Sequence, residues 1–198
     1  MFTGGPRENR TPASAMRMPR NTTLLWARLC LPILSEFATL VNMLKIRIIT
    51  LGKFKEPAFR ELEKEYLKRL SPFAKVKVIE LAEVPYRASD DMARAKAKEA
   101  ELIKRNLPEG AIVILLEEKG KLRGSKELAT FLERLGSLGQ ELVFVIGSGA
   151  GLDPSLREVC NYQISLSPLT FTHNFARVLL EEQIYRVCTI IAGKEYHK

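Results

Sequence analysis

Two short, uninterrupted apolar runs constrain the fold of this chain more than any other feature. They span residues 111–116 (AIVILL) and 142–146 (LVFVI), and each has the length of a β-strand. A strand that is apolar at every position is typical of a parallel sheet covered by helices on both faces. The sequence therefore predicts a mostly parallel sheet that lies between layers of helices.

The rest of the chain, from residue 43 onward, alternates between strand and helix patterns. Further strands are predicted at 44–51, 76–79 and 161–166, and helices at 56–70, 89–106, 126–135 and 173–192. Ser89 or Asp90 is expected to cap the second helix, and Ser125 the third. The last helix is expected to bury an apolar side made of Phe175, Val178, Leu179, Val187, Cys188 and Ile191. This alternation predicts the fold class α/β, with a mostly parallel sheet.

The first 42 residues differ in composition from the remainder. They hold five arginines, no lysine and two acidic residues, which gives +3 of the net charge of +8, and they show neither helix nor strand periodicity. A targeting signal at 16–38 is the alternative, but Arg28 and Pro32 interrupt its apolar stretch. We expect a non-native or disordered extension at 1–42 and one domain at 43–198, with translation starting at Met43.

Several classes of protein have no support in this sequence. No run approaches the roughly 18 apolar residues of a membrane-spanning helix, and the three cysteines are scattered without CxxC spacing. His173 and His197 belong to no metal-binding motif, and neither a GxSxG nor a Walker motif is present. We therefore expect a cytoplasmic protein that uses no metal, membrane, covalent nucleophile or ATP. Cys160 and Cys188 are expected to be buried structural residues.

A glycine-rich segment, residues 147–151 (GSGAG), directly follows the second apolar run and is called the glycine loop below. Glycines let a ligand approach the backbone, and loops at the carboxyl ends of parallel strands are where such sheets bind ligands. The spacing is not that of a dinucleotide-binding fingerprint, and no acidic residue follows at the required distance, which disfavours a Rossmann-type methyltransferase. From these residues alone, the segment is either a binding loop or a tight turn.

Four segments together carry a family signature: MLKIRIITLGK from residue 43, FVIGSGAGL from 144, SLSPLTFTH from 165 and GKEYHK from 193. The last helix adds Arg177, Glu181, Gln183, Tyr185 and Arg186. Over residues 43–198 the chain resembles the RlmH family, a branch of the SPOUT methyltransferases. The resemblance implies an S-adenosylmethionine-dependent enzyme that methylates N3 of a pseudouridine in a stem-loop of 23S ribosomal RNA, on the assembled 70S ribosome. It also implies a carboxyl-terminal trefoil knot and a homodimer.

The resemblance implies a cofactor site made of three strand-end segments. The corresponding residues here are Leu116, Gly147, Leu166, Ser167, Pro168, Leu169, Thr170 and Phe171. Two positions depart from the family pattern, because Ser148 stands where a second glycine is usual and Thr172 where a proline is usual. Ser148 is expected to add a side chain near the cofactor; this either weakens cofactor binding or is offset by the local freedom of Gly149.

The resemblance also implies the catalytic residues. His197, with Tyr196 beside it, is the first candidate for the base that removes the N3 proton, and His173 is the second. Arg177 is expected to steady an anionic base or a phosphate. Without the resemblance, His197 reads as a solvated terminal residue and Arg177 as a surface charge.

Two further expectations concern the last helix and the partners. Glu181 and Glu182 point in different directions on a helix, so one is expected to be solvated and the other paired. Val187, Ile190 and Ile191 are expected to form an apolar dimer contact, with burial inside a single chain as the alternative. The +5 charge of residues 43–198 suits contact with RNA phosphates. A non-catalytic ribosome-binding or RNA-binding protein and a methyltransferase for another RNA are the alternative functions.

Overall fold

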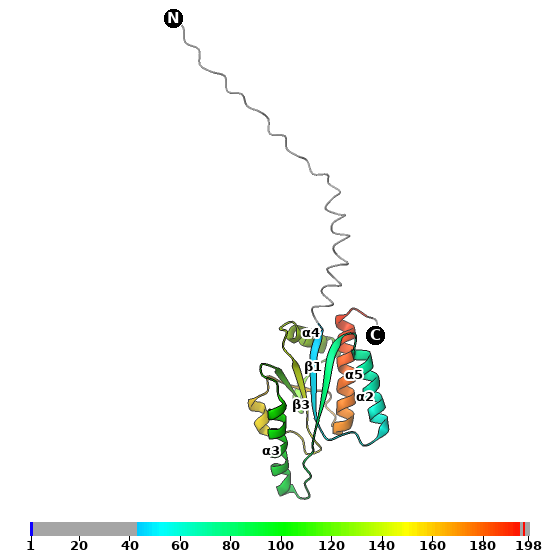
Figure 1. Ribbon diagram of the computed structural model, residues 1–198, viewed down its shortest axis with the longest axis vertical. Coiled ribbons are helices and arrows are strands. Elements are labelled where there is room, and N and C mark those ends of the chain that lie inside the picture. The colour runs from blue at the N-terminus through cyan, green and yellow to red at the C-terminus, as the bar shows by residue number, and fades with distance from the viewer. Residues whose placement is uncertain (2–42, 195, 197–198) are drawn as a thin grey trace. The chain divides into compact units, whose positions relative to one another are not determined.

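A five-stranded parallel sheet forms the centre of the protein. The structure, a computed structural model, describes Met1, residues 43–194 and Tyr196 (Figure 1). The strand order is β2–β1–β4–β3–β5, with β1 Leu44–Leu51, β2 Ala74–Leu81, β3 Ile112–Leu122, β4 Leu142–Ile146 and β5 Tyr162–Ser165. Every pair of neighbours is parallel. The predicted α/β class and parallel sheet are confirmed, while the trefoil knot stays a prediction.

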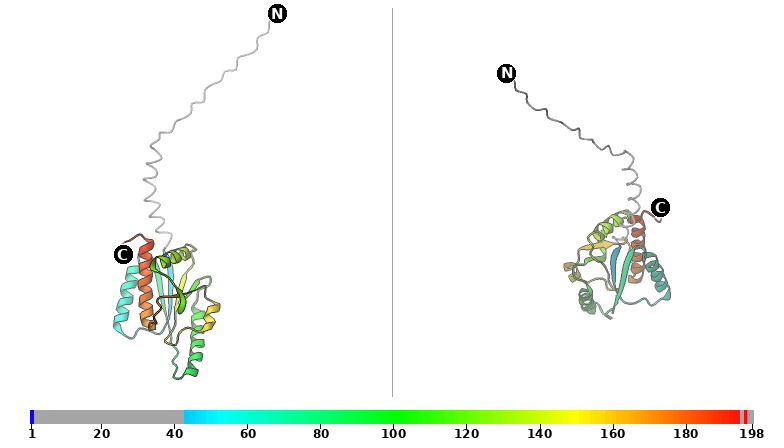
Figure 2. Two further views of the ribbon diagram at one scale, coloured as in Figure 1. Left: turned by 180° about the vertical axis from the view of Figure 1, so that it is seen from behind. Right: turned by 45° about the horizontal axis from the view of Figure 1, so that its top comes forward.

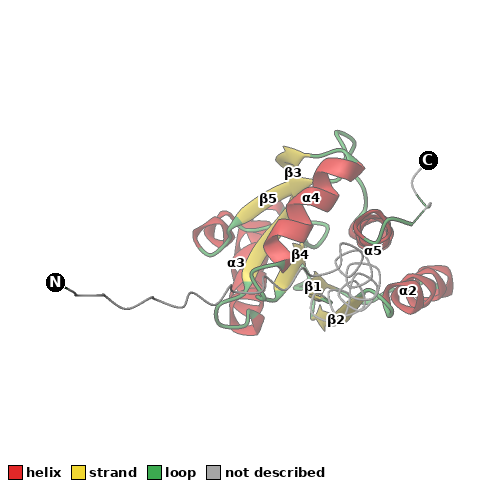
Figure 3. Cartoon of the chain, turned by 90° about the horizontal axis from the view of Figure 1, so that it is seen from above, coloured by secondary structure: helices red, strands yellow, loops and turns green. Residues whose placement is uncertain are grey.

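Helices cover both faces of this sheet. They are α2 (Pro57–Leu70), α3 (Ser89–Asn106), α4 (Ser125–Gly136), the short 3₁₀ helix η1 (Pro154–Glu158) and α5 (His173–Ile191). Helices α2, α4 and α5 lie on one face and α3 lies on the other (Figures 2 and 3). No helix in the described part of the chain is long and apolar enough to cross a membrane.

The predicted helix boundaries hold to within one residue, but the predicted caps are wrong. The N-cap positions are Ala88 and Gly124, so Ser89 and Ser125 are the first residues inside their helices. At α5 a side-chain cap does form, because the Thr172 hydroxyl accepts a hydrogen bond from the Phe175 amide. The cap rule places a polar residue near a helix start, but it does not distinguish two adjacent positions.

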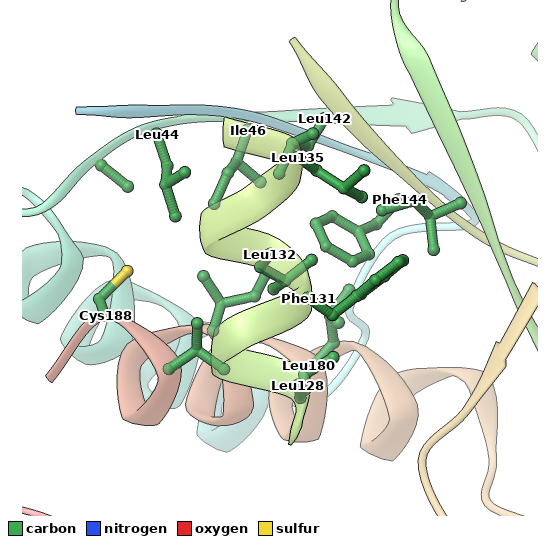
Figure 4. Close-up of a cluster of buried hydrophobic side chains, with 14 of the residues drawn as sticks. Leu44, Ile46, Leu128, Phe131, Leu132, Leu135, Leu142, Phe144, Leu180 and Cys188 are labelled. Atoms are coloured by element: carbon green, nitrogen blue, oxygen red, sulfur yellow. The ribbon is translucent and has the colours of Figure 1, made fainter. Parts of the chain in front are cut away.

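Two hydrophobic cores, one on each face of the sheet, hold these layers together. Phe144 and Ile46 point into the larger core, where they meet Leu132 and Leu135 of α4 (Figure 4). The strand residues that point to the opposite face, such as Val145, pack against α3 in the second core. All five side chains of β4 are therefore buried, as the uninterrupted apolar run predicts.

The buried side of α5 differs from the predicted one. Phe175 is 58% exposed and Ile191 is 37% exposed, although Val187 and Cys188 are buried as expected. The buried residues of α5 are Arg177, Leu180, Glu181, Ile184, Val187, Cys188 and Thr189. Apolar residues occur nearly all around this helix, so their spacing does not identify the buried face. A buried ionic cluster, described below, occupies part of that face.

An interruption in the β3–β5 ladder shapes the edge of the sheet. Leu116 and Lys121 both pair with Ile164, so residues 117–120 leave the ladder between them. At Gly120 a Cβ atom would lie 2.4 Å from the backbone carbon of Ile164, so only glycine fits this close approach. The predicted strand at 111–116 thus continues to residue 122 by way of residues 117–120, which are not paired with β5.

Candidate active site

A pocket of about 1040 Å³ lies at the carboxyl edge of the sheet. Three segments supply most of its wall: residues 116–119 after the regular part of β3, the glycine loop after β4, and residues 164–176 from β5 into α5. Glu56 and Phe59 add a further side near the start of α2. Parallel strands bring their carboxyl ends to one edge, which explains why segments far apart in sequence meet here.

The pocket brings together most of the residues predicted to bind the cofactor. Seven of the predicted eight belong to its wall: Leu116, Gly147, Leu166, Ser167, Leu169, Thr170 and Phe171. Pro168 is exposed and is not part of the wall. The Ser167 hydroxyl accepts a hydrogen bond from the Leu169 amide at 2.9 Å, which gives this segment a defined turn.

The glycine loop is both a tight turn and part of the pocket wall. The Gly151 amide donates to the Ser148 carbonyl at 2.9 Å, and Gly151 has a φ of +82°, a conformation that favours glycine. A Cβ atom at Gly147 would lie 2.9 Å from the carbonyl carbon of Gly151, so the chain folds too closely for a side chain there. The tight-turn interpretation is therefore confirmed, and the binding-loop interpretation stays a prediction for a turn that lies at the pocket.

Ser148 does not behave as its departure from the family pattern led us to expect. Its side chain is buried, and its hydroxyl donates a hydrogen bond to Glu99 Oε2 at 2.9 Å. The same hydroxyl oxygen accepts a hydrogen bond from the Ala150 amide at 3.3 Å. The hydroxyl is thus engaged within the protein, and nothing in this geometry supports a weakening of cofactor binding.

His173, the second candidate for the base, lies at the pocket. It is the first residue of α5 and belongs to the pocket wall. A Cβ atom at Gly52 would come within 3.8 Å of His173 Nε2 and 3.4 Å of Glu83 Oε2, so the end of β1 passes close to both side chains. His197, the first candidate, lies outside the described residues.

Arg177 is occupied by carboxylates and is not placed to contact a substrate. Its guanidinium donates to Glu63 and, at 2.8 Å, to Glu80 Oε1, while a Glu181 oxygen lies 3.8 Å from Nε. The group also stacks on the Phe54 ring at 4.1 Å, and the residue is only 2% exposed. The structure gives no support to the prediction that Arg177 steadies a phosphate. It ties α2, β2 and α5 together instead.

Glu181 is the unusual member of this cluster. It is fully buried, and neither of its carboxylate oxygens has a hydrogen-bond partner among the described residues. Burial, and then the nearby Glu63 carboxylate, raise the pKa of Glu181 to about 9. Its carboxyl group is therefore protonated at neutral pH, which leaves Arg177 to pair with Glu63 and Glu80. One of Glu181 and Glu182 was expected to be solvated, and this prediction is wrong: Glu181 is buried and Glu182 is paired with Arg186.

The described part of the carboxyl-terminal tail folds back on α5. The Tyr196 hydroxyl lies 3.3 Å from Glu182 Oε1, which also accepts a hydrogen bond from Arg186 at 2.5 Å. The Tyr196 ring packs edge-on against Tyr185 with ring centres 4.9 Å apart. Burial raises the pKa of the Tyr196 phenol, and the Glu182 carboxylate adds to this. The phenol therefore stays protonated and acts as a hydrogen-bond donor.

Tyr196 and the pocket lie at different levels of α5. Ten residues separate Phe175, in the pocket wall, from Tyr185, against which Tyr196 packs. This corresponds to about 15 Å along a helix axis. Tyr196 is not part of the wall. Within one chain, the structure does not bring Tyr196 together with the predicted cofactor residues.

Sequence reasoning missed several buried charges and treated one cysteine incorrectly. Glu99 lies on the same side of α3 as Ala95 and Ile103, so a carboxylate on an apolar stripe was the available signal. Cys188 is buried as predicted, and burial raises the pKa of its thiol to about 12, which keeps it inert. Cys160 is only half-buried.

Comparison with known proteins gives consistent matches over most of the chain. The family model described as "Predicted SPOUT methyltransferase" matches residues 44–197. A protein of Desulforamulus reducens named Ribosomal RNA large subunit methyltransferase H is 42% identical over 160 residues, which covers 79% of this chain and all of that protein. A protein of the same name from Bifidobacterium animalis subsp. lactis is 44% identical over 159 residues, 78% of this chain and all of that one.

A solved structure titled as a probable methyltransferase from Bordetella pertussis Tohama I also aligns with the chain. The alignment has a TM-score of 0.47 and 16% sequence identity, and it covers 77% of this chain and 97% of that one. This similarity is too distant to add to the sequence matches.

The protonated state of Glu181 predicts a characteristic pH dependence of stability. In the unfolded chain a glutamate releases its proton near its ordinary pKa of 4.5, whereas the folded protein holds it up to about pH 9. The protonated Glu181 therefore contributes to the free energy of unfolding fully below pH 4.5, and this contribution is lost as the pH rises toward 9. Glu181→Gln removes the titration, so its free energy of unfolding relative to wild type should rise by roughly 1 kcal/mol per pH unit.

Chemical denaturation between about pH 5 and pH 9 measures this difference. Glu133→Gln, which removes an exposed carboxylate from α4, controls for the loss of one negative charge. A constant difference between Glu181→Gln and wild type across this range would show that Glu181 is ionised in the folded protein.

Proposed function

The chain belongs to the SPOUT methyltransferases and, within them, to the RlmH family, and we propose that it methylates N3 of a pseudouridine in 23S ribosomal RNA. The enzyme is an S-adenosylmethionine-dependent methyltransferase of large-subunit ribosomal RNA. The proposed substrate is the assembled 70S ribosome, which sets the proposed location of the protein in the cytoplasm. The pocket at the carboxyl edge of the sheet is the observation that carries this proposal.

The pocket has the chemistry that S-adenosylmethionine requires. Leu116, Leu166 and Leu169 supply apolar wall for a flat base, while the glycine loop supplies closely approaching backbone. The volume of about 1040 Å³ is at the upper end for a small-molecule site, which leaves space for a nucleotide beside the cofactor. No described residues form a group of three metal-binding side chains at this pocket.

The reaction depends mainly on positioning. S-adenosylmethionine supplies an activated methyl group, so the protein has to bring N3 of the nucleotide into line with it. A base would have to take the N3 proton, and the electron pair left on N3 would form the new bond to the methyl carbon while the sulfur keeps the electrons of the carbon–sulfur bond. No covalent enzyme intermediate is needed, which agrees with the lack of a nucleophile motif in the sequence.

We assign the removal of the N3 proton to His197. A histidine has a pKa near neutrality and is well suited to accept a proton at physiological pH. Tyr196 directly precedes His197, and its hydroxyl donates to the Glu182 carboxylate, so Tyr196 anchors the start of the tail that carries His197. Arg186, which packs over the Tyr196 ring at 4.9 Å, fixes the ring that precedes His197.

The separation of Tyr196 from the pocket supports an active site shared between two chains. Tyr196 packs about 15 Å along α5 from the wall residue Phe175. A tail that remains there cannot complete the pocket of its own chain. In a homodimer with a two-fold axis, the tail of each chain would complete the pocket of the other.

Exposed apolar side chains at the pocket rim suit this dimer. Leu169 is 72% exposed, Phe171 is 40% exposed and Phe175 is 58% exposed, and all three belong to the pocket wall. A cluster of exposed apolar residues around a site is typical of a protein–protein contact. The previously expected contact is incorrect at Val187, which is fully buried within its own chain. We propose the rim residues as the dimer contact.

The decisive test of the function is methylation of defined ribosomes. Protein is mixed with S-adenosylmethionine that carries a radiolabelled methyl group and with 70S ribosomes that lack the modification, and the labelled nucleotide is then located. We expect one label on N3 of a pseudouridine in 23S ribosomal RNA, and less label on isolated 50S subunits or naked RNA.

Ribosomes that carry uridine at the labelled position control for the need for pseudouridine. Label at another nucleotide would show that the proposed target nucleotide is wrong. Cofactor binding without any label would indicate that the enzyme methylates a different RNA. If the protein binds no cofactor and transfers no label, the result would favour the alternative of a non-catalytic RNA-binding protein.

Replacement of His197 tests its role as the base. His197→Ala should lower the methylation rate constant by about 100-fold or more, because a positioned base contributes that much to proton transfer. The dissociation constant of S-adenosylmethionine should stay within about twofold of wild type, since the pocket wall is intact. A variant with the full rate constant would rule out His197 as the base.

A charge at the pocket rim tests the dimer contact. Phe175→Asp should weaken dimerisation at least about tenfold, because a carboxylate would have to be desolvated in the contact. Leu138→Asp is the matched control, because Leu138 is equally apolar and 61% exposed but lies between α4 and β4. Sedimentation equilibrium measures both variants. A Phe175→Asp protein that dimerises as tightly as Leu138→Asp would place the contact elsewhere.

A further inference from the structure

A buried glutamate on α3 joins two loops at the edge of the sheet. Glu99 is only 2% exposed and lies on the side of α3 that packs against the sheet. Its Oε1 accepts a hydrogen bond from the Val84 amide at 2.9 Å, in the segment after β2. Its Oε2 accepts one from the Ser148 hydroxyl at 2.9 Å, in the glycine loop. One carboxylate therefore connects the segments that follow β2 and β4.

The contact with Ser148 reaches the turn of the glycine loop. The Ser148 hydroxyl oxygen also accepts from the Ala150 amide at 3.3 Å, and the Ser148 carbonyl accepts from the Gly151 amide at 2.9 Å. Ser148 itself is 6% exposed. The hydroxyl and the carbonyl of Ser148 therefore both stabilise the turn, and the carboxylate of Glu99 anchors that turn to α3.

We propose that Glu99 and Ser148 are positioning residues that hold the glycine loop in the form that binds S-adenosylmethionine. The inference rests on the proposed function only for the identity of the ligand. Three of the five residues of this loop are glycines, which have the greatest freedom in an unrestrained chain. A hydrogen bond to a buried carboxylate is among the stronger ones in proteins, so it can remove this freedom before the cofactor arrives.

This restraint depends on the side chain of Ser148. A glycine at position 148 would have no hydroxyl to donate to Glu99. The Glu99 carboxylate is buried and would lose one of its two hydrogen-bond donors if Ser148 were absent. The Ser148 hydroxyl therefore gives the glycine loop a fixed connection to α3.

The test compares Ser148→Ala with wild type in the full-length protein. Without the hydroxyl, the dissociation constant of S-adenosylmethionine, measured by calorimetry, should rise at least about fivefold. In the cofactor-free protein, hydrogen exchange at the amides of residues 149–151 should become about tenfold faster. In the methylation assay the KM for the cofactor should rise by a larger factor than kcat falls, as expected for lost preorganisation of binding.

Variants of Glu99 test how strongly cofactor binding depends on its carboxylate. Glu99→Gln keeps a hydrogen-bonding group of the same size without the charge, so it should impair binding less than Glu99→Ala. Glu99→Ala should also speed exchange at the Val84 amide, which Ser148→Ala should not. Adding Glu99→Ala to Ser148→Ala should weaken cofactor binding less than Glu99→Ala does alone, because the two residues share one hydrogen bond.

Controls separate this role from a general loss of stability. Ser137→Ala removes an exposed hydroxyl that bonds the Arg134 carbonyl at the end of α4, and it should change neither measurement. Exchange at the amides of β4 reports on the intact core. A Ser148→Ala protein with binding and loop exchange within about twofold of wild type would overturn the inference. If wild type binds no S-adenosylmethionine, the proposed function fails. Hydrogen exchange at the amides of residues 149–151 then decides by itself whether Glu99 and Ser148 hold the glycine loop.

Discussion

Burial of β4 on both faces of the sheet is the constraint on which the rest of the structure depends. Each of its five side chains enters one of the two cores, so the strand has no face left for a ligand. Only its carboxyl end is accessible, where the chain turns sharply at Gly147. The neighbouring strands are parallel and end at the same edge, which is why the pocket is built from their loops.

The sequence was sufficient for the sheet and for most of the pocket wall, because strand burial and strand ends depend on short-range patterns. The run at 142–146 coincides with β4, and the segment 166–171 lies at the pocket except for Pro168. It was insufficient for the buried charges. Arg177 reads as a surface residue until α2 and β2 bring Glu63 and Glu80 to it, across more than 90 intervening residues. Such contacts depend on packing between distant segments, which periodicity does not encode.

Two buried glutamates serve different purposes in this architecture. Glu181 gives up its charge and belongs to the cluster that joins α5 to α2. Glu99 receives two hydrogen bonds and joins loops at the pocket. Both lie on the apolar side of a helix, where a carboxylate is costly unless it is neutralised or fully bonded. One glutamate therefore supports the framework, and the other supports the site built on that framework.

The distance along α5 between Tyr196 and the pocket has a genetic consequence if the two chains share their active sites. Consider one chain with a defective tail and a second chain with a blocked cofactor pocket, each inactive as a homodimer. In a mixed dimer, the intact pocket of the first chain would face the intact tail of the second, so one of the two sites would be complete. Two different inactive alleles would then complement each other within a single cell, whereas two alleles with the same defect would not.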